Sequence, residues 1–444
     1  MINWEDEMLN FRKTVELTPA RERAAERDSI LSACVGATGD VTLTDSAIII
    51  LYVTMLGAGD MFSLLTTSLL PLFNGLFILP MAFLAARFGN QNVITHCCFF
   101  GFLAYILIAA APFFGGGAIP VMLMMLIIFA VLHTGYIAGW FPMLDTFLSR
   151  ERRNIYLGKM RFWWQLSSVI FIFIVGLCIG KHPKLWHLQL VLLIAAIIFF
   201  GRTFFIAHIP VFKTHKKETT KFKEGLTLSL RNKSLTGYSV YLFVLNLAAY
   251  GTIPLTTIYL KKYLSAPDNI IVFISAITLG GMLLGSLCAG KIIKKIGIRK
   301  TFLIIHFTYA LTNFLIFFVG KDTMSTNLTY AAIAVLLLLY SFTFANANIV
   351  STSEMMALAT PGNKVMAMAF CGSFYYTGQG LSRLMSSLIL GCGILAPEWH
   401  IGSVVFCHYQ TLFLIYSIAI AFAALLLTIV PAVFPKGNYS YYMQ

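Results

Sequence analysis

The sequence predicts an all-α membrane protein in which twelve transmembrane helices form two pseudo-symmetric six-helix bundles. Hydrophobic residues make up 58% of the chain and charged residues only 11%, whereas a soluble domain carries about 25% charge. The apolar residues gather in continuous runs, each long enough to cross a hydrocarbon core of about 30 Å. A transmembrane β-barrel would show alternating segments of about 10 residues instead. The third observation is a basic segment, 211–235, that separates six runs from six.

These runs define the helices and the domains. In chain order the predicted helices lie near 28–57, 60–86, 92–113, 118–148, 156–180, 186–210, 236–263, 268–293, 300–320, 328–358, 364–394 and 402–434. The predicted division is an N-terminal tail 1–27, a bundle 28–210, a linker 211–235, a second bundle 236–435 and a C-terminal tail 436–444.

Charge placement gives the orientation. The net charge is +14, and most of the 32 Lys and Arg residues fall in the N-terminal tail, the linker and the loops that lie on the same side as these two. Basic residues favour the cytoplasmic side, so we expect both termini in the cytoplasm of a multi-pass protein, in the bacterial inner membrane. The charge therefore reflects orientation in a lipid bilayer, and we expect no nucleic-acid partner.

The motifs of enzymes and metal sites are missing from the sequence. The eight cysteines lie mostly inside apolar runs, where they behave as small hydrophobes, and they lack metal-ligand spacing. There is no phosphate-binding glycine loop, catalytic triad spacing or HExxH motif. We therefore expect no enzyme activity, no cofactor, no metal and no ATP-driven transport.

A basic turn occurs once in each half. The copy Gly290–Lys300 has a weaker counterpart in the first half, so that Arg87 aligns with Lys295 and Gly89 with Gly297. Both pairs are 208 residues apart. Constant offsets of this kind indicate an internal duplication, which is typical of secondary transporters.

This repeated turn resembles the loop motif of the major facilitator superfamily, in which glycine, an acidic residue, a basic residue, a second glycine and two basic residues recur at fixed spacing. The resemblance extends to the twelve runs, the central linker and the charge bias. It implies a cytoplasmic gate in which acidic residues pair with the basic residues of the motif. The residues expected there are Arg87, Gly89, Asp145, Gly290, Lys295, Gly297, Arg299 and Glu354. The other interpretation is that these charges only orient the chain.

Two aspartates interrupt the first helix. Asp40 and Asp45 lie about 18 Å and 25 Å beyond Asp28 along a helix. Charged groups inside a membrane are costly and are therefore functional candidates. Either carboxyl group could carry a coupling proton, or it could serve packing alone through neighbouring Thr and Ser hydroxyls. His133 in the fourth run is a further proton candidate, or a helix–helix hydrogen-bonding residue.

Arg383 lies well inside the eleventh run, at a depth comparable to that of Asp45. An arginine keeps its charge and needs an acceptor. Three roles remain open: a pair with Asp45 that bridges the bundles and closes the outer side, binding of an anionic group of a substrate, or a local pair or contact with headgroups.

The superfamily resemblance implies that helices one, four, seven and ten line a central cavity, with two, five, eight and eleven beside them. Besides Arg383, the substrate-binding candidates on these helices are Tyr136, Trp140, Asn246, Tyr250, Asn346, Asn348, Tyr376 and Gln379. Aromatic rings with amide and hydroxyl groups suit a polar, largely uncharged solute. Tyrosine and tryptophan are also common at membrane interfaces.

We therefore predict a monomeric secondary transporter that moves a small polar solute, sugar-like or nucleoside-like, by alternating access with proton symport. Sodium coupling and uniport stay open. One alternative is proton-driven efflux of hydrophobic compounds, since the cavity helices hold many Phe and Met residues. Another class is a receptor or scaffold that uses the same fold without transport.

Overall fold

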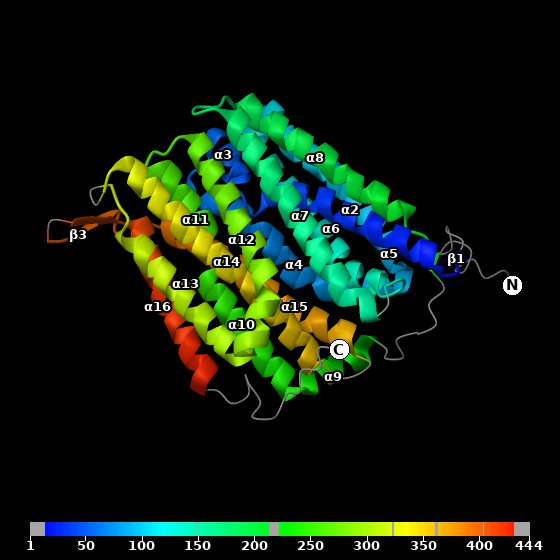
Figure 1. The fold of residues 1–444 in the computed structure, drawn as a ribbon. Coiled ribbons are helices and arrows are strands. Elements are labelled where there is room, and N and C mark those ends of the chain that lie inside the picture. Colours follow the sequence, from blue (N-terminus) through cyan, green and yellow to red (C-terminus); the bar gives the residue numbers. More distant parts are fainter. Residues whose placement is uncertain are drawn as a thin grey trace.

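The computed structural model describes residues 14–148, 150–212, 222–321, 324–359, 363–402 and 404–429, which are mainly long helices packed side by side (Figure 1). The elements are β1 (Thr14–Val15), α2 (Pro19–Leu43), α3 (Ile48–Met55), α4 (Asp60–Phe88), α5 (Asn90–Ala109), η1 (Ala111–Gly117), α6 (Ala118–Leu144), α7 (Arg150–Ile179), α8 (Leu185–His208), β2 (Val211–Phe212), α9 (Phe222–Arg231), α10 (Lys233–Ala249), α11 (Thr252–Ile258), η2 (Tyr259–Tyr263), α12 (Asp268–Ile296), α13 (Ile298–Phe318), α14 (Thr326–Leu358), α15 (Lys364–Gly391), β3 (Glu398–Ile401), β4 (Val404–Cys407) and α16 (His408–Ile429). The predicted C-terminal tail 436–444 lies outside these ranges, as do residues 1–13 of the predicted N-terminal tail and 213–221 of the predicted linker.

Ten helices within the described ranges are long and apolar enough to cross a membrane, and α2 with α3 makes an eleventh span bent by 40°. The remaining long helix, α15, is more polar because it carries Arg383 among serine, glutamine and tyrosine residues. The helical two-bundle fold class is thus confirmed. The first span begins nine residues earlier than predicted, at Pro19, where Thr18 caps the helix.

The repeat is visible in the backbone. α4 and α12 each have 29 residues, and their ends differ by the same 208 positions as the motif residues. Gly89 and Gly297, which follow these helices, adopt φ values of +90° and +81°. Only glycine takes such angles without strain, so the two turns need glycine. The duplicated sequence motif therefore corresponds to a duplicated helix–turn–helix unit.

The two bundles meet along α4 with α15 and along α7 with α12 (Figure 1). Glycines allow this close approach: a Cβ atom on Gly75 would lie 2.2 Å from Oγ1 of Thr377, and one on Gly380 would lie 2.5 Å from Leu72. Ser373 also donates to the Gly75 carbonyl at 2.8 Å. The α4–α15 contact is therefore a backbone-close seam between the halves.

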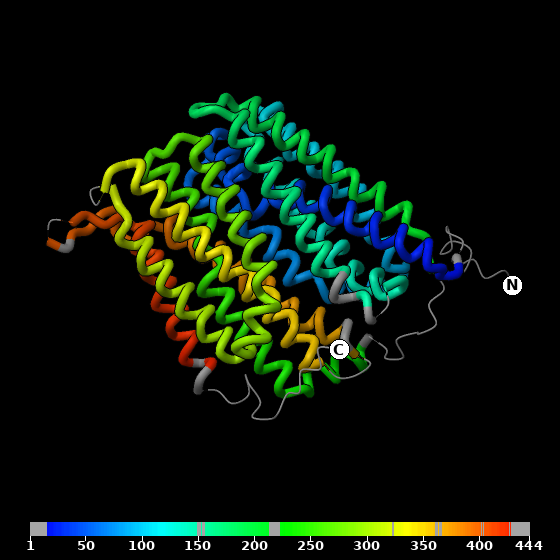
Figure 2. Tube along the Cα trace, in the orientation of Figure 1, coloured from blue at the N-terminus to red at the C-terminus, as the bar shows by residue number. Residues whose placement is uncertain are grey.

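Two short strand pairs lie at the ends of the helices. β1 pairs in parallel with β2, which ties the start of the described chain to the segment after α8. β3 and β4 form a hairpin that extends beyond the helices in Figure 2. Trp399 and Phe406 of this hairpin pack with Phe317 at the end of α13. The hairpin occupies the start of the predicted twelfth run, so α16 begins six residues later than expected.

Candidate functional site

A buried arginine pairs with one of the two aspartates of the first span. Nη2 of Arg202 in α8 lies 2.6 Å from Oδ2 of Asp40 in α2, and the arginine side chain is 2% exposed. Thr44, a neighbour that could have satisfied the carboxylate, donates instead to the Asp40 backbone carbonyl. The sequence pattern did not select Arg202 as a site residue.

The local sequence makes room for this guanidinium. A Cβ atom on Gly36, one helical turn before Asp40, would lie 1.6 Å from Nε of Arg202. The rings of Tyr136 and Phe199 lie 4.0 Å and 5.0 Å from its central carbon. Cation–π contacts of this kind stabilise a desolvated charge by about 2 kcal/mol. Glycine on one side and aromatic rings on the other therefore hold Arg202 against Asp40.

The same carboxylate meets a histidine. Nε2 of His133 in α6 lies 3.3 Å from Oδ2 of Asp40, and its Nδ1 lies 3.4 Å from Oδ1 of Asn74 in α4. Thr134 lies 3.0 Å from the same Asn74 oxygen. We call Asp40, Asn74, His133, Thr134 and Arg202 the Asp40 cluster. It joins four helices of the N-terminal bundle.

The second aspartate joins the two bundles. Nη2 of Arg383 in α15 lies 2.8 Å from Oδ1 of Asp45, in the turn between α2 and α3. The Arg383 side chain is 1% exposed, and the ring of Tyr250 lies 4.5 Å from its central carbon. Of the three roles considered for Arg383, this geometry brings together the groups needed for the bridging pair.

Arg383 also donates to two backbone carbonyls that lack their usual helical N–H partner because a proline follows four residues later. Nη1 donates to Thr67 O at 2.8 Å and Nε to Tyr250 O at 3.5 Å. Each carbonyl lies four residues before a proline, Pro71 and Pro254, which has no N–H to donate back. The sequence therefore offers acceptors for a buried arginine at two points, one in each bundle.

A small cavity of about 10 Å³, called the central cavity below, lies beside this pair and is lined mainly by the C-terminal bundle. It consists of two adjoining hollows that share Tyr250 and Phe344. The first is lined by Leu245, Asn246, Ala249, Tyr309, Ala347, Asn348, Ser351 and Tyr375, and the second by Asp45, Ile253, Tyr340 and Arg383. Gln379 donates to Asn246 at 3.3 Å at its edge. The lining offers amide and hydroxyl groups between aromatic rings, with an ion pair at one end.

The remaining substrate candidates lie elsewhere. The rings of Tyr136 and Trp140 lie 5.2 Å apart at a tilt of 41° in the N-terminal bundle, and Arg202 lies over the Tyr136 ring. Asn346 donates to Phe342 O on its own helix, and Tyr376 packs with Ile78 in a small apolar cluster. These four residues are not among those that line the two hollows within the described chain.

Sequence reasoning did not select Tyr309, Phe344 and Ser351, which do line the cavity. Phe344 and Ser351 lie on the same helix as Asn348, four residues before it and three after it. This helical spacing could have identified both, because it places all three on one face.

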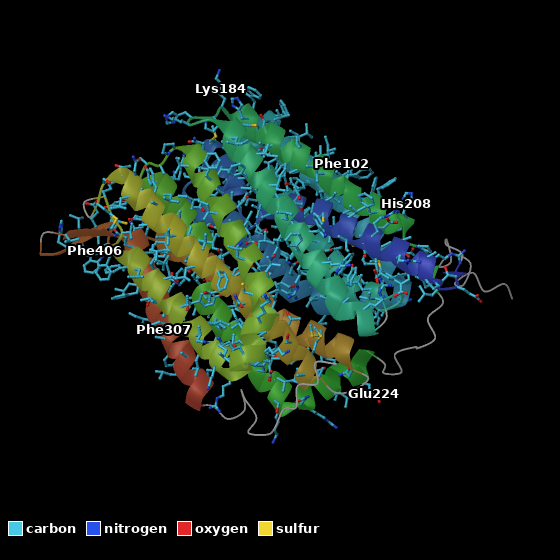
Figure 3. The ribbon with its side chains drawn as sticks, viewed as in Figure 1. Phe102, Lys184, His208, Glu224, Phe307 and Phe406 are labelled. Carbon is cyan, nitrogen blue, oxygen red and sulfur yellow. The ribbon has the colours of Figure 1, made fainter. Side chains whose placement is uncertain are left out.

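Polar contacts also join the bundles at the end that the charge pattern predicts to be outer. Nζ of Lys262 lies 3.7 Å from Asp60, which also accepts a hydrogen bond from Tyr409. Ser387 donates to Met61 O at 2.6 Å, and the backbone N–H of Ala47 donates to Ser275 at 3.1 Å. Lys184 and Phe406 mark this end in Figure 3, and Glu224 lies at the opposite end.

At that opposite end, the expected gate residues do not form the pairs that the resemblance implied. The Arg87 side chain lies over the Phe88 ring at 5.4 Å and is not paired with Asp145 in the described chain. Lys295 is exposed and not paired with Glu354 in those ranges. Both acidic residues interact with other groups. Gly290 and Arg299 lie in α12 and α13, beside the turn at Gly297. The turns of the motif are thus formed without the predicted charge pairs.

Buried ion pairs within and between two helical bundles, together with a duplicated helix–turn–helix unit, are typical of a membrane transporter. Residues 30–382 match the Major Facilitator Superfamily, and the chain belongs to this family. Within the described chain, no group of three His, Cys, Asp or Glu residues could hold a metal ion.

Solved structures with the same fold include a nucleoside transporter, NupG, in two forms. A point mutant of NupG is 16% identical with a TM-score of 0.66, over 93% of this chain and 100% of that one. A second NupG structure is 15% identical with a TM-score of 0.66, over 94% and 100%. No curated protein matches the chain by sequence. At these identities the likeness shows the fold.

Proposed function

We propose that this transporter moves a small polar solute, sugar-like or nucleoside-like, together with protons by alternating access. The observation that carries the proposal is the lining of the central cavity. Asn246, Asn348 and Tyr375 provide hydrogen-bonding groups, and Tyr250 and Tyr309 provide aromatic faces. A few polar groups among aromatic rings suit a ligand with hydroxyl groups and a flat or hydrophobic face. The nucleoside transporter among the solved structures is consistent with this class.

Proton coupling is supported by the buried titratable groups. Asp40, Asp45 and His133 all lie within the bundles, and each contacts a partner that a proton would affect. Ionisable residues at membrane depth are expensive and mark ion pathways. A purely structural role would be served by apolar residues at lower cost.

Alternating access is supported by the contacts at the outer end. The pairs Asp45–Arg383 and Asp60–Lys262 each join the N-terminal bundle to the C-terminal bundle. An outward-facing state has to break both, and their polar character allows water to replace each contact. We therefore assign Asp45–Arg383 as the inner part of the outer closure.

The test is a thermal-shift screen of the purified protein. Sugars, nucleosides, amino acids, organic anions and lipophilic cations are compared at about pH 5.5 and 7.5, with and without sodium. A bound solute stabilises the protein by RT ln(1 + [L]/Kd). We expect a saturable shift from one polar class, which Asn348→Ala reduces. Asn327→Ala on the same helix, at its exposed start, is the matched control.

The other outcomes separate the alternatives. A shift with lipophilic cations alone would indicate efflux of hydrophobic compounds. A polar solute that binds but does not cross a proteoliposome membrane would indicate a receptor. A shift that depends on sodium and not on pH would contradict proton coupling.

A further inference from the structure

We propose that His133 carries the coupling proton on Nδ1, and that the side-chain amide of Asn74 reverses its orientation when this proton binds or leaves. The inference rests on the proposed proton coupling and deepens it. It concerns the Asp40 cluster, which lies in the N-terminal bundle apart from the central cavity.

The first argument is that both ring nitrogens of His133 face oxygen atoms. Nε2 lies 3.3 Å from Oδ2 of Asp40 and Nδ1 lies 3.4 Å from Oδ1 of Asn74. A neutral imidazole has one donor nitrogen and one acceptor nitrogen, whereas the protonated ring has two donors. Two facing oxygens therefore match the protonated ring. In this state Thr134 also donates its hydroxyl proton to Asn74.

The same residues satisfy a second state that contains one proton fewer. If the Asn74 amide turns by about half a rotation, its NH₂ group takes the place of its oxygen and supplies two donors. One proton is donated to Nδ1 of the neutral ring and the other to Oγ1 of Thr134. The Thr134 hydroxyl then donates to Ala130 O, which lies 2.8 Å away. The two hydrogen-bond networks differ by one proton and one amide orientation.

Asp40 is a poorer proton acceptor than His133 on the same geometric grounds. Its Oδ2 already faces two donors, Nη2 of Arg202 at 2.6 Å and Nε2 of His133. Its Oδ1 is buried without a hydrogen-bond partner among the described residues, so a proton placed there would lack an acceptor. An unsatisfied buried donor costs about 1–3 kcal/mol. The proton is therefore better placed on the imidazole.

The charges around His133 define what the proton changes. The titratable and charged groups that adjoin it are Asp40 from α2, Cys97 and Cys98 from α5, Tyr136 from its own helix and Arg202 from α8. α4 contributes the neutral amide of Asn74. Asp40 and Arg202 cancel each other, so proton binding takes the cluster from net neutral to one positive charge. The N–H bond on Nδ1 is the one covalent bond that forms or breaks, and the hydrogen bonds of Asn74 and Thr134 rearrange around it.

Asn74 connects this change to the seam between the bundles. The next residue, Gly75, accepts a hydrogen bond from Ser373 of α15 at 2.8 Å and packs directly against Thr377. The amide that responds to the proton is thus one residue from a close contact of α4 with the other bundle. This adjacency gives the proton a physical route to the relative position of the bundles.

The experiment is an NMR titration of the full-length protein labelled at the histidine ring carbons, without any solute. The His133 signal is identified by its absence in His133→Gln. The titration covers about pH 5 to 8, and we expect the chemical shifts of this signal to change with pH. Asn74→Asp replaces the amide with a group that only accepts, so it should raise the His133 midpoint by about one pH unit or more. Asn92→Asp, outside the cluster, is the matched control and should leave it unchanged.

A His133 signal that stays constant over this range would overturn the inference, and so would an unchanged midpoint in Asn74→Asp. If His133→Gln does not fold, the Asn74→Asp comparison identifies the signal by its displacement and still decides. The titration needs no solute, so its result is independent of the solute screen. A titrating His133 in a protein that binds no polar solute would count against the proposed function alone.

Discussion

The two bundles share a scaffold but differ in what they bury. Adding 208 to the residue number leads from α4 to α12 and from the start of α6 to the start of α14. The same offset leads from Asp40 to Ala248, from Asn74 to Met282 and from His133 to Ser341. The charged cluster of the first bundle thus has no acidic or imidazole counterpart in the second. Duplication has preserved helix lengths and turns while the polar residues have diverged.

The cavity shows the opposite asymmetry. Asn348, which lines it, corresponds to Trp140, and Tyr250 corresponds to Thr42. Trp140 is 5% exposed in the core of the N-terminal bundle. A large ring there fills the space that is open beside the amide in the other half. In the proposed mechanism, one bundle holds the proton and the other contributes most of the solute site.

The largest effect should come from Asp40→Ala, which leaves the Arg202 guanidinium buried without its carboxylate. Removing one partner of a buried pair costs about 3–5 kcal/mol, measurable as a lower unfolding temperature in detergent. Asp60→Ala removes a longer, partly exposed pair and should cost about 1 kcal/mol or less. Asp40→Ala with Arg202→Leu should recover much of the loss. Equal costs for the two single variants would show that the Asp40 cluster is not a stability centre.

Gly36→Ala should also lower the stability of the protein, by less than Asp40→Ala. The added methyl group would overlap Nε of Arg202, and overpacking of this kind costs about 1–3 kcal/mol. Gly59→Ala is the control, because it has open space around it and φ of −71°. At the matching places the second bundle has Val244 instead of Gly36 and Gln410 instead of Arg202. A stable Gly36→Ala variant would mean that Arg202 can leave its place at little cost.

Asp45→Asn should shift the protein toward an outward-open state by about 1.5–3 kcal/mol, the value of a hydrogen bond to a charged group. Spin labels at positions 184 and 327, on exposed sites of the two bundles, should move apart. Asp40→Asn changes a contact inside one bundle and should leave this distance unchanged. If both variants gave the same distance distribution as the unmodified protein, Asp45–Arg383 would not be part of the closure.

The smallest effect should come from Pro71→Ala. The new N–H would compete with Arg383 for the Thr67 carbonyl and weaken the outer closure by about 0.5–1 kcal/mol. Pro80→Ala in the same helix is the matched control, because its new N–H does not compete for a carbonyl that Arg383 uses. The same pair of spin labels reports the difference. A larger opening with Pro80→Ala than with Pro71→Ala would contradict the role of the open carbonyl.

Composition, loop charge and the repeated turn were enough to predict the helical fold and the family. The matching depths of Asp45 and Arg383 were also readable, because both could be counted from the cytoplasmic ends of their helices. The Asp40–Arg202 contact could not be predicted from the sequence, because hydrophobic periodicity does not say which face of α2 meets α8. Gly36 leaves space for a guanidinium and Pro71 leaves a carbonyl without its usual helix partner. Neither feature can be interpreted from the sequence until a buried arginine is known to lie beside it.

The η2 turn has a consequence for how the two halves depend on each other. Asp60 and Asp268 occupy equivalent places in the repeat, and consecutive lysines reach them: Lys262 crosses to the first and Lys261 stays with the second. The first half has Val53 and Thr54 where these lysines would fall. One pair of lysines therefore serves the equivalent acids of both repeats, so the two halves depend on each other at this end of the molecule.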